Sequence, residues 1–188
     1  TSVSPFESVQ HGLDLSSSGD TIYVKPGTYQ ENLDMGGKWV SLRSTGGKDV
    51  TFLSSNGSGT VITAETGEES NTEVVGFTIK DASTGISIGS DEEVTIRDCY
   101  ITDTNYPIEV YADNDINLFN ITLGLNGLQA VKMNGENIGY SSSSVTRTWN
   151  INNLTVNPEG HIYVQSSSSS ATATLKIVGN AELAFSAD

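Results

Sequence analysis

Residues 74–139 are VVGFTIKDASTGISIGSDEEVT, IRDCYITDTNYPIEVYADNDIN and LFNITLGLNGLQAVKMNGENIG when they are written in three units of 22 residues. Apolar residues recur at the same places of the units and form four columns: Val74, Ile96 and Leu118, followed by Tyr140; Ile79, Ile101 and Leu123; Val94, Ile116 and Ile138; and Ile86, Ile108 and Ala130. A fixed period of this length is typical of a repeat architecture. Apolar residues also alternate with polar ones, as at Ile86 and Ile88, and this alternation predicts short strands.

Three short strands in each unit leave no room for a helix, so we expect an all-β fold, a right-handed single-stranded parallel β-helix. Each 22-residue unit forms one turn, which pairs with the next turn at a spacing of about 4.8 Å. We expect a single domain over residues 1–188, with turns from 20 to 178 and a C-terminal segment at 179–188. The register breaks once, because the strand end expected near residue 145 comes at Val156, which indicates an insertion of roughly 11 residues around 141–150.

Residues 4–14 are predicted to form an N-terminal helical cap. Ser4 is the expected N-cap, Pro5 the first helical residue, and Glu7 completes a capping box. Such a helix covers the open strand edge and the core of the first turn. Residues 66–72, in contrast, are predicted to protrude from a corner as a polar loop.

The sequence that opens the solenoid is distinctive. Residues 19–24 are Gly-Asp-Thr-Ile-Tyr-Val and residues 26–33 are Pro-Gly-Thr-Tyr-Gln-Glu-Asn-Leu. With the preceding helix, this opening resembles the first turn of right-handed parallel β-helix proteins of the pectate-lyase-like and pectin-methylesterase-like superfamily. The resemblance implies the fold, which enzymes and non-catalytic proteins share.

The catalytic segments of those families are missing from this sequence. Residues 27–31 match the Gly-x-Tyr-x-Glu segment of pectin methylesterases, and residues 129–131 resemble their Gln-Ala-Val segment. The segments that carry the esterases' catalytic Asp pair and Arg do not occur, and no basic cluster suits the lyases' base. We therefore expect a non-catalytic member and assign no catalytic residue. The alternative is a carbohydrate-active enzyme, a polysaccharide lyase or a pectin-esterase-like protein, that acts on an acidic polysaccharide with Ca²⁺.

The composition indicates which classes of partner and which cellular location fit the chain. Nine Lys and Arg stand against 23 Asp and Glu, for a net charge of −14, which argues against a nucleic-acid partner. No apolar run is long enough for membrane insertion. The polar composition and a start at Thr1 without Met fit a processed extracellular or cell-surface protein. Cys99, the single cysteine, forms no internal disulfide and is expected to be buried.

Acidic residues also recur with the period and are therefore expected to stack one turn apart. The pairs are Asp81 and Asp103, Asp91 and Asp113, and Glu93 and Asp115. Oxygen ligands suit Ca²⁺, and β-helix lyases bind Ca²⁺ between carboxylates, so these residues are a candidate Ca²⁺ site. The alternative is an acidic corner in water, because Asp is an ordinary turn residue. No cofactor is required by the sequence.

Three further groups of residues are candidates for contacts. Tyr106, Tyr111 and Trp149 are candidate glycan contacts. Asn56, in the sequon Asn-Gly-Ser, is the glycosylation candidate, whereas Asn120 and Asn153 are expected to turn inward as a ladder with Asp98. Arg147, Trp149, Leu183 and Phe185 are candidate assembly residues, since an open C-terminal end exposes strand edge and core.

These observations lead to a functional expectation. The chain is expected to be a non-catalytic secreted or cell-surface solenoid, which is structural and self-assembling in a surface layer, sheath or filament, or else binds glycans. Its expected partners are copies of itself or a neighbouring surface domain, with polysaccharide as the further candidate.

Overall fold

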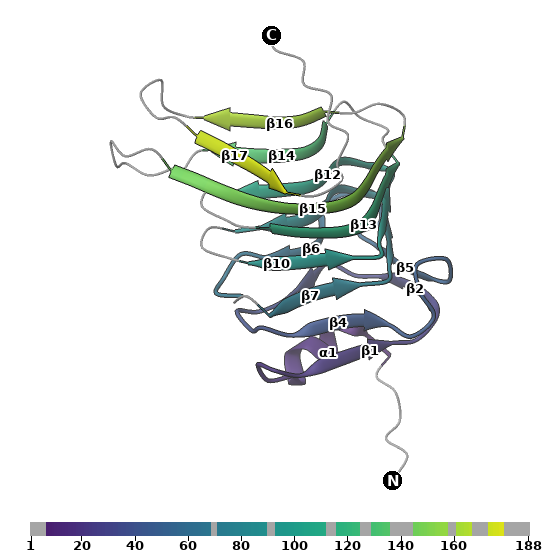
Figure 1. Cartoon of the computed structure of the whole chain (residues 1–188). Coiled ribbons are helices and arrows are strands. Elements are labelled where there is room, and N and C mark those ends of the chain that lie inside the picture. The colour runs from purple at the N-terminus through teal and green to yellow at the C-terminus, as the bar shows by residue number, and fades with distance from the viewer. Residues whose placement is uncertain are drawn as a thin grey trace.

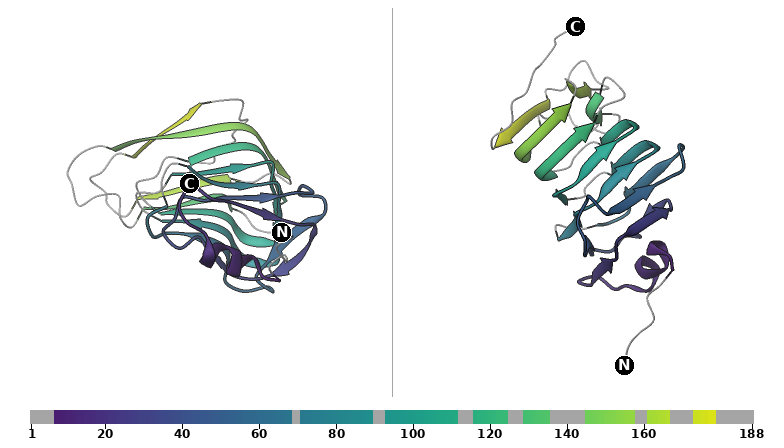
Figure 2. Two further views of the ribbon diagram at one scale, coloured as in Figure 1. Left: turned by 90° about the horizontal axis from the view of Figure 1, so that it is seen from below. Right: turned by 90° about the vertical axis from the view of Figure 1, so that its right-hand side faces the viewer.

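The computed structural model describes residues 7–68, 71–89, 93–111, 116–124, 129–135, 145–157, 161–166 and 173–178. It is a parallel β-solenoid with one short N-terminal helix (Figure 1). The turns stack from the N-terminal end to the C-terminal end, and the strands form slanted layers in side view (Figure 2). The predicted all-β solenoid fold is confirmed.

Four consecutive turns have three separate strands each. They are β1 (Thr21–Val24), β2 (Gly27–Gln30) and β3 (Leu33–Asp34); β4 (Ser41–Ser44), β5 (Thr51–Ser54) and β6 (Thr60–Ala64); β7 (Thr72–Val75), β8 (Thr78–Lys80) and β9 (Ala82–Ile88); and β10 (Val94–Arg97), β11 (Tyr100–Thr102) and β12 (Thr104–Tyr111). Beyond them the first two strands merge, because β13 (Ile116–Gly124) pairs with both β10 and β11. The remaining strands are β14 (Gln129–Gly135), β15 (Val145–Asn157), β16 (His161–Ser166) and β17 (Ala173–Val178).

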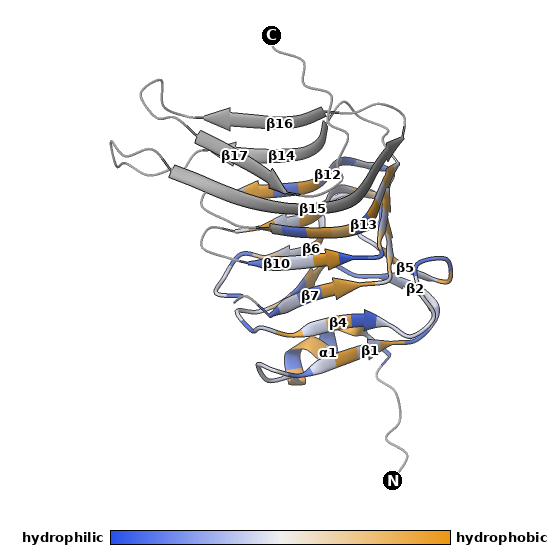
Figure 3. Ribbon diagram, viewed as in Figure 1, coloured by the Kyte–Doolittle hydropathy of each residue, from blue (hydrophilic) through white to orange (hydrophobic). Residues whose placement is uncertain are grey.

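The strands form two parallel sheets. The larger sheet has eleven strands and follows β1-β4-β7-β10-β13 before it returns along β11-β8-β5-β2, with β15 and β17 added beyond β13. The smaller sheet has six strands in the order β3-β6-β9-β12-β14-β16. The apolar residues lie between the sheets, and Figure 3 shows how they alternate with polar residues along the strands.

The 22-residue columns are confirmed where the turns are regular. Val74 pairs with Ile96, which pairs with Leu118, and all three side chains are buried. Ile101 lies between Ile79 and Leu123 in the same way. Stacked aliphatic side chains thus form the core, since each inward position repeats from turn to turn.

The register changes at the predicted insertion. Ile116 pairs with Trp149, Leu118 with Ile151, and Leu123 with Val156. The step to Val156 is confirmed, but the predicted places of Ile138 and Tyr140 in their columns are wrong, because Trp149 and Ile151 occupy them. Ile138 and Tyr140 themselves lie outside the described residues.

A second correction concerns the column of Ile86 and Ile108. Ile108 pairs with Val131, not with Ala130, so this step has 23 residues. The pairing of β14 with β16 is also irregular between Gln129 and Val131. A bulge of one residue shifts the register of a strand, and the apolar pattern alone did not reveal it.

The helix that covers the first turn is α1 (Val9–Leu15). It begins later than predicted: Ser8, and not Ser4, is the N-cap, and its hydroxyl accepts a hydrogen bond from the backbone N–H of His11. The helix contacts β1 and β3 and buries Val9 and Leu13 against them. It lies across the N-terminal end of the stack (Figures 1 and 2).

Charged side chains of the first turn hold both ends of α1. The carboxylate of Glu31 accepts hydrogen bonds from the N–H groups of Val9 and Gln10, each at 2.9 Å. The ammonium of Lys38 donates to the carbonyl of Leu13 at 2.5 Å and that of Ser16 at 3.3 Å. A negative charge at the amino end and a positive charge at the carboxyl end both favour the helix.

The side chain of Gln10 covers the edge of β3. Its amide nitrogen donates to the carbonyl of Asp34 at 3.1 Å, and its carbonyl accepts from the N–H of Asp34 at 2.8 Å. The first strand of the smaller sheet thus has hydrogen-bond partners on the side away from β6. Exposed sheet edges are commonly covered in this way.

Candidate functional site

The outer surface of β1, β4, β7, β10 and the first half of β13 carries two columns of side chains, and we call this surface face A. The first column is Tyr23, Arg43, Val75, Arg97 and Phe119, and the second is Thr21, Ser41, Glu73, Thr95 and Asn117. These positions alternate with the buried residues Leu42, Val74, Ile96 and Leu118. The pleat of the strands therefore turns both columns outward.

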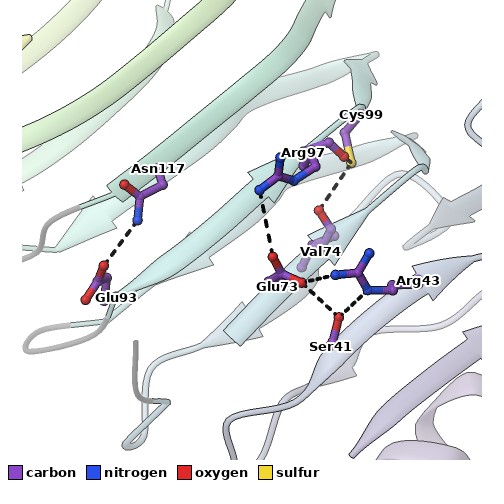
Figure 4. Close-up of polar contacts among 8 residues, drawn as sticks. All are labelled: Ser41, Arg43, Glu73, Val74, Glu93, Arg97, Cys99 and Asn117. Carbon is purple, nitrogen blue, oxygen red and sulfur yellow. Dashed lines mark hydrogen bonds and ion pairs between the residues drawn. The ribbon is translucent and has the colours of Figure 1, made fainter. Parts of the chain in front are cut away.

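Glu73 is at the centre of an ion-pair network on face A (Figure 4). Its carboxylate pairs with Arg43 on β4 and lies 3.9 Å from the guanidinium of Arg97 on β10. Ser41 donates to the carboxylate at 3.1 Å, and Nε of Arg43 donates to the Ser41 hydroxyl at 2.7 Å. Because β7 lies between β4 and β10, Glu73 links three successive turns.

Arg97 is held in position by contacts that leave its hydrogen-bond donors unused. Its guanidinium lies over the ring of Phe119, 4.8 Å from the ring centre, which is a favourable cation–π contact. The 3.9 Å approach to Glu73 is an ion pair without a hydrogen bond. Among the described residues, no partner accepts a hydrogen bond from this guanidinium, and the side chain is 42% exposed. The guanidinium of Arg97 is therefore placed by Phe119 and Glu73, while its N–H groups make no hydrogen bond to other described residues.

Apart from Val75, the rest of face A is polar or aromatic. Asn117 donates to the carboxylate of Glu93 at 3.2 Å. Tyr23 is 68% exposed at the N-terminal end of the first column. An exposed aromatic ring on the same surface as amide, hydroxyl and guanidinium groups can bind an extended ligand that has both apolar and hydrogen-bonding surfaces.

A second polar group lies on the smaller sheet and differs from face A in exposure. Ser87 donates to Glu65, and Thr84 donates to Glu109 at 3.4 Å. Thr84, Ser87 and Glu109 are buried. Face A is therefore the more accessible of the two.

Three of the six candidate Ca²⁺ ligands, Asp81, Asp103 and Glu93, lie in the described part of the chain, and these three do not form a metal site. Asp81 and Asp103 are one turn apart, at corners where φ is 52° for both, and Asp81 pairs with Lys80 at 3.3 Å. No group of three or more His, Cys, Asp or Glu residues in the described part of the chain could hold a metal ion. Glu93 bonds to Asn117, while Asp91, Asp113 and Asp115 lie outside the described residues.

Left-handed corner positions account for part of the acidic repeat. Gly76, Asp98 and Asn120 have φ of 81°, 55° and 56°, and each is one turn from the next. Gly, Asn and Asp adopt this conformation more readily than other residues. Asp81 and Asp103 occupy left-handed corners of the same kind, so their 22-residue spacing has a backbone cause.

One step of the predicted asparagine ladder, from Asn120 to Asp98, is present, but the inward orientation predicted for Asn120 is wrong. Asn120 donates to the carboxylate of Asp98 at 2.6 Å across one turn, yet Asn120 is exposed and does not turn inward. Asn56 is also exposed, at a corner with φ of 61°, and accepts a hydrogen bond from Gln30 at 3.4 Å. Asn153 lies on β15, where the side chains are outside the described part.

The three candidate glycan contacts lie on different sheets. Tyr106 and Tyr111 belong to β12 of the smaller sheet, and Tyr106 is half-buried. Trp149 belongs to β15 of the larger sheet. These residues therefore do not form one surface.

Of the candidate assembly residues, Trp149 and Arg147 lie on β15, where they pair with Ile177 and Leu175. Leu183 and Phe185 lie outside the described residues. The structure thus places two of these residues beside β17.

Two carboxylates with structural roles were missed by sequence reasoning. Glu68 was expected on a protruding loop but is fully buried, where it accepts hydrogen bonds from the N–H groups of Gly37 and Thr66, each at 2.8 Å. Glu73 and Arg97 were not recognised as a pair. The spacing of Glu73 and Arg97, one period plus two residues, could have revealed them as diagonal neighbours on adjacent strands.

Comparisons with known proteins add one similarity. No family model matches the chain. The chain is 28% identical over 129 residues to the uncharacterized protein YwoF of Bacillus subtilis (strain 168), over 62% of this chain and 25% of that protein. The chain thus spans a quarter of the length of this relative. In the described residues, no helix is both long enough and apolar enough to span a membrane.

Proposed function

We propose that the chain is a non-catalytic solenoid module that binds glycans through face A. The observation that carries the proposal is the column of Tyr23, Arg43, Arg97 and Phe119 along the stacked turns. Sugar rings have apolar faces that pack on aromatic side chains, and hydroxyl groups that accept hydrogen bonds from guanidinium groups. Face A offers both kinds of group on a surface held by hydrogen bonds and ion pairs.

The non-catalytic part of the proposal is supported by the roles of the carboxylates. Glycoside hydrolysis ordinarily uses two carboxyl groups that flank the bond to be cleaved. Glu31 holds α1, Glu68 holds a corner, and Glu73 links three turns. Each of these three carboxylates has structural contacts with the protein, which favours a structural role for them.

The alternative is a carbohydrate-active enzyme that acts on an acidic polysaccharide with Ca²⁺. Its support is the resemblance of residues 19–33 to the opening of pectate-lyase-like proteins. The net charge of −14 argues against it, because the protein repels a polyanion unless cations lie between them. We propose membership of that superfamily as a non-catalytic protein, at the cell surface or outside the cell.

Self-association is the second candidate function. It is supported by the apolar residues of the C-terminal sequence and by the long strand β15, which extends beyond β13 at its N-terminal end. Sedimentation of the purified chain at rising concentration separates this function from glycan binding. A single monomeric species at all concentrations would remove it.

Binding to immobilised polysaccharides tests the proposed function. The wild-type chain is expected to be retained by at least one insoluble glycan and to release no reducing or unsaturated ends from it. Retention should fall in the Tyr23→Ala and Arg97→Gln variants and stay unchanged in Lys25→Gln, which removes an exposed charge from the turn between β1 and β2. Failure of every glycan in a broad panel to retain the chain would overturn the proposal, and turnover would favour the enzyme.

A further inference from the structure

Among the described residues, the charges on face A and of Glu93 at its edge cancel one another, although the protein as a whole is strongly acidic. Arg43 and Arg97 carry two positive charges, and Glu73 and Glu93 carry two negative charges. The whole chain carries a net charge of −14. A polyanion that approaches face A therefore meets a repulsive overall field and no local excess of positive charge.

The two arginines are also partly committed to Glu73. An anionic ligand that formed a close ion pair with Arg43 or Arg97 would compete with the Glu73 carboxylate, which already pairs with both. A hydroxyl group needs only a hydrogen-bond donor and leaves this network in place. Arg97 has five N–H donors and uses none of them in hydrogen bonds to other described residues.

The length of the first column sets the length of the ligand. Tyr23 and Arg97 are separated by Arg43 and Val75, so three steps between strands lie between them. At the usual strand spacing this distance is about 14 Å. A single sugar ring does not reach from one to the other, whereas an oligosaccharide does. Val75 is half-buried between the two arginines and gives the column an apolar position at its centre.

We infer that face A binds an uncharged glycan chain that runs across the strands, with Tyr23 under one sugar ring and Arg97 donating hydrogen bonds to hydroxyl groups of another. This inference rests on the proposed glycan-binding function and adds the class of ligand and its direction. It assigns Arg97 and Tyr23 as the residues that determine specificity. Arg43 and Glu73 are positioning residues, because they act through Arg97.

Matched polymers test the inference directly. Three glucans are used, each as a matched pair: cellulose, dextran and a mixed-linkage β-glucan. The uncharged member is the soluble native or hydroxyethyl polymer, and the charged member is its carboxymethyl derivative, so the two differ mainly in charge. Affinity is measured by electrophoresis through gels that contain each polymer. The uncharged member of at least one pair should retard the chain more strongly than the carboxymethyl member, and added NaCl should leave this retardation unchanged.

Variants locate the binding on face A. Arg97→Gln and Tyr23→Ala should each weaken binding of the uncharged polymer roughly tenfold, as expected for the loss of one or two hydrogen bonds or of one ring contact. Arg97→Lys keeps the charge but loses the planar donor group, and should weaken binding to a similar extent. Lys25→Gln is the control, and circular dichroism confirms that each variant is folded.

The outcomes separate the inference from the function on which it rests. Stronger binding of the carboxymethyl polymers, or binding that the Arg97 and Tyr23 variants leave intact, would overturn the inference while glycan binding stands. Absence of binding to every polymer, charged and uncharged, would overturn both.

Discussion

The carboxylate of Glu31 accepts a hydrogen bond from the N–H of Gln10 at 2.9 Å, and this contact joins the end of β2 to the start of α1. Glu31 is the last residue of the Gly-Thr-Tyr-Gln-Glu segment that matches pectin methylesterases. In this chain the residue holds the N-terminal helix on the solenoid. The segment that matches therefore has a structural role in the first turn of this chain.

The Glu31→Gln variant should be less stable than the wild type. The neutral amide keeps the size of the side chain but loses the charge that favours the helix N-terminus and weakens bonds to two N–H groups and to Ser8. We expect a loss of about 1–2 kcal/mol in the free energy of unfolding, measured by urea denaturation. The exposed Glu7→Gln change is the matched control and should have little effect. Equal stability of the two variants would contradict the role of Glu31.

The Ile101→Asp variant should fail to fold. Ile101 is fully buried between Ile79 and Leu123, so an aspartate there carries an unpaired charge into the core. The cost exceeds the stability of a typical domain of this size once the lost apolar contacts are included. Thr28→Asp places the same side chain on the exposed side of β2 and should fold normally. A folded Ile101→Asp protein with the wild-type melting temperature would show that the columns are wrong.

The Glu73→Gln variant should gain affinity for anionic polymers. Among the described residues, removal of this carboxylate leaves Arg43 and Arg97 with Glu93 as the remaining negative charge on or beside face A, for a local excess of one positive charge. Because these side chains are partly exposed, the loss of stability should be about 1 kcal/mol or less. Gel retardation by carboxymethyl polymers should rise at low salt and disappear at high salt. No gain at low salt would contradict the proposed balance of charges.

Cys99 should be unreactive in the folded protein. Burial raises the pKa of the Cys99 thiol from 9.0 to about 11. A thiol reagent at pH 8 should modify the chain only after urea unfolds it, because the thiolate is the reactive form.

The same shift has a consequence for stability. The pKa of the Cys99 thiol is higher in the folded state than in the unfolded state. The contribution of this thiol to the free energy of unfolding is therefore complete below pH 9 and is lost as the pH rises towards 11. The free energy of unfolding should therefore fall more steeply from pH 9 to 11 in the wild type than in Cys99→Ala. Parallel curves for the two proteins would contradict the shift.

Calcium should have no effect on stability. Asp81 and Asp103 occupy left-handed corners, which explains their spacing without a metal. We expect equal melting temperatures in millimolar Ca²⁺ and in chelator. A higher melting temperature in the presence of Ca²⁺ would show that the folded state binds the ion. It would restore the site predicted at Asp81 and Asp103 or at Asp91, Asp113, Glu93 and Asp115.

The fold could be predicted because its strongest signal repeats. Inward positions such as Ile79 and Ile101 recur with one spacing, and each repeat supports the same register. The pairing of Ile108 with Val131, a step of 23 residues, could not be predicted, since Ala130 and Val131 are both apolar and either residue fits the pattern. The N-cap at Ser8 depends on Glu31, which is distant in the sequence.

The candidate site was much less predictable than the fold. Outward residues such as Arg43, Glu73 and Arg97 do not repeat in type, so no column of like residues marks them, although the period does place Glu73 and Arg97 diagonally on adjacent strands. Their contact follows from the register of three turns, and that register includes a step of 32 residues from Leu42 to Val74. The aromatic residues chosen by type alone, Tyr106 and Trp149, belong to different sheets.

The side-chain amide of Gln10 pairs with β3 as the peptide group of a neighbouring strand would, but it does not continue into a strand. It offers one donor and one acceptor to Asp34, as a neighbouring strand would, but the chain beyond it is helical. The solenoid is therefore terminated at this end in the way that a polymer is terminated by a monofunctional end group. Another strand can pair with β3 only if the side chain of Gln10 leaves Asp34. Addition of a strand to this edge of the smaller sheet is therefore blocked at the first turn.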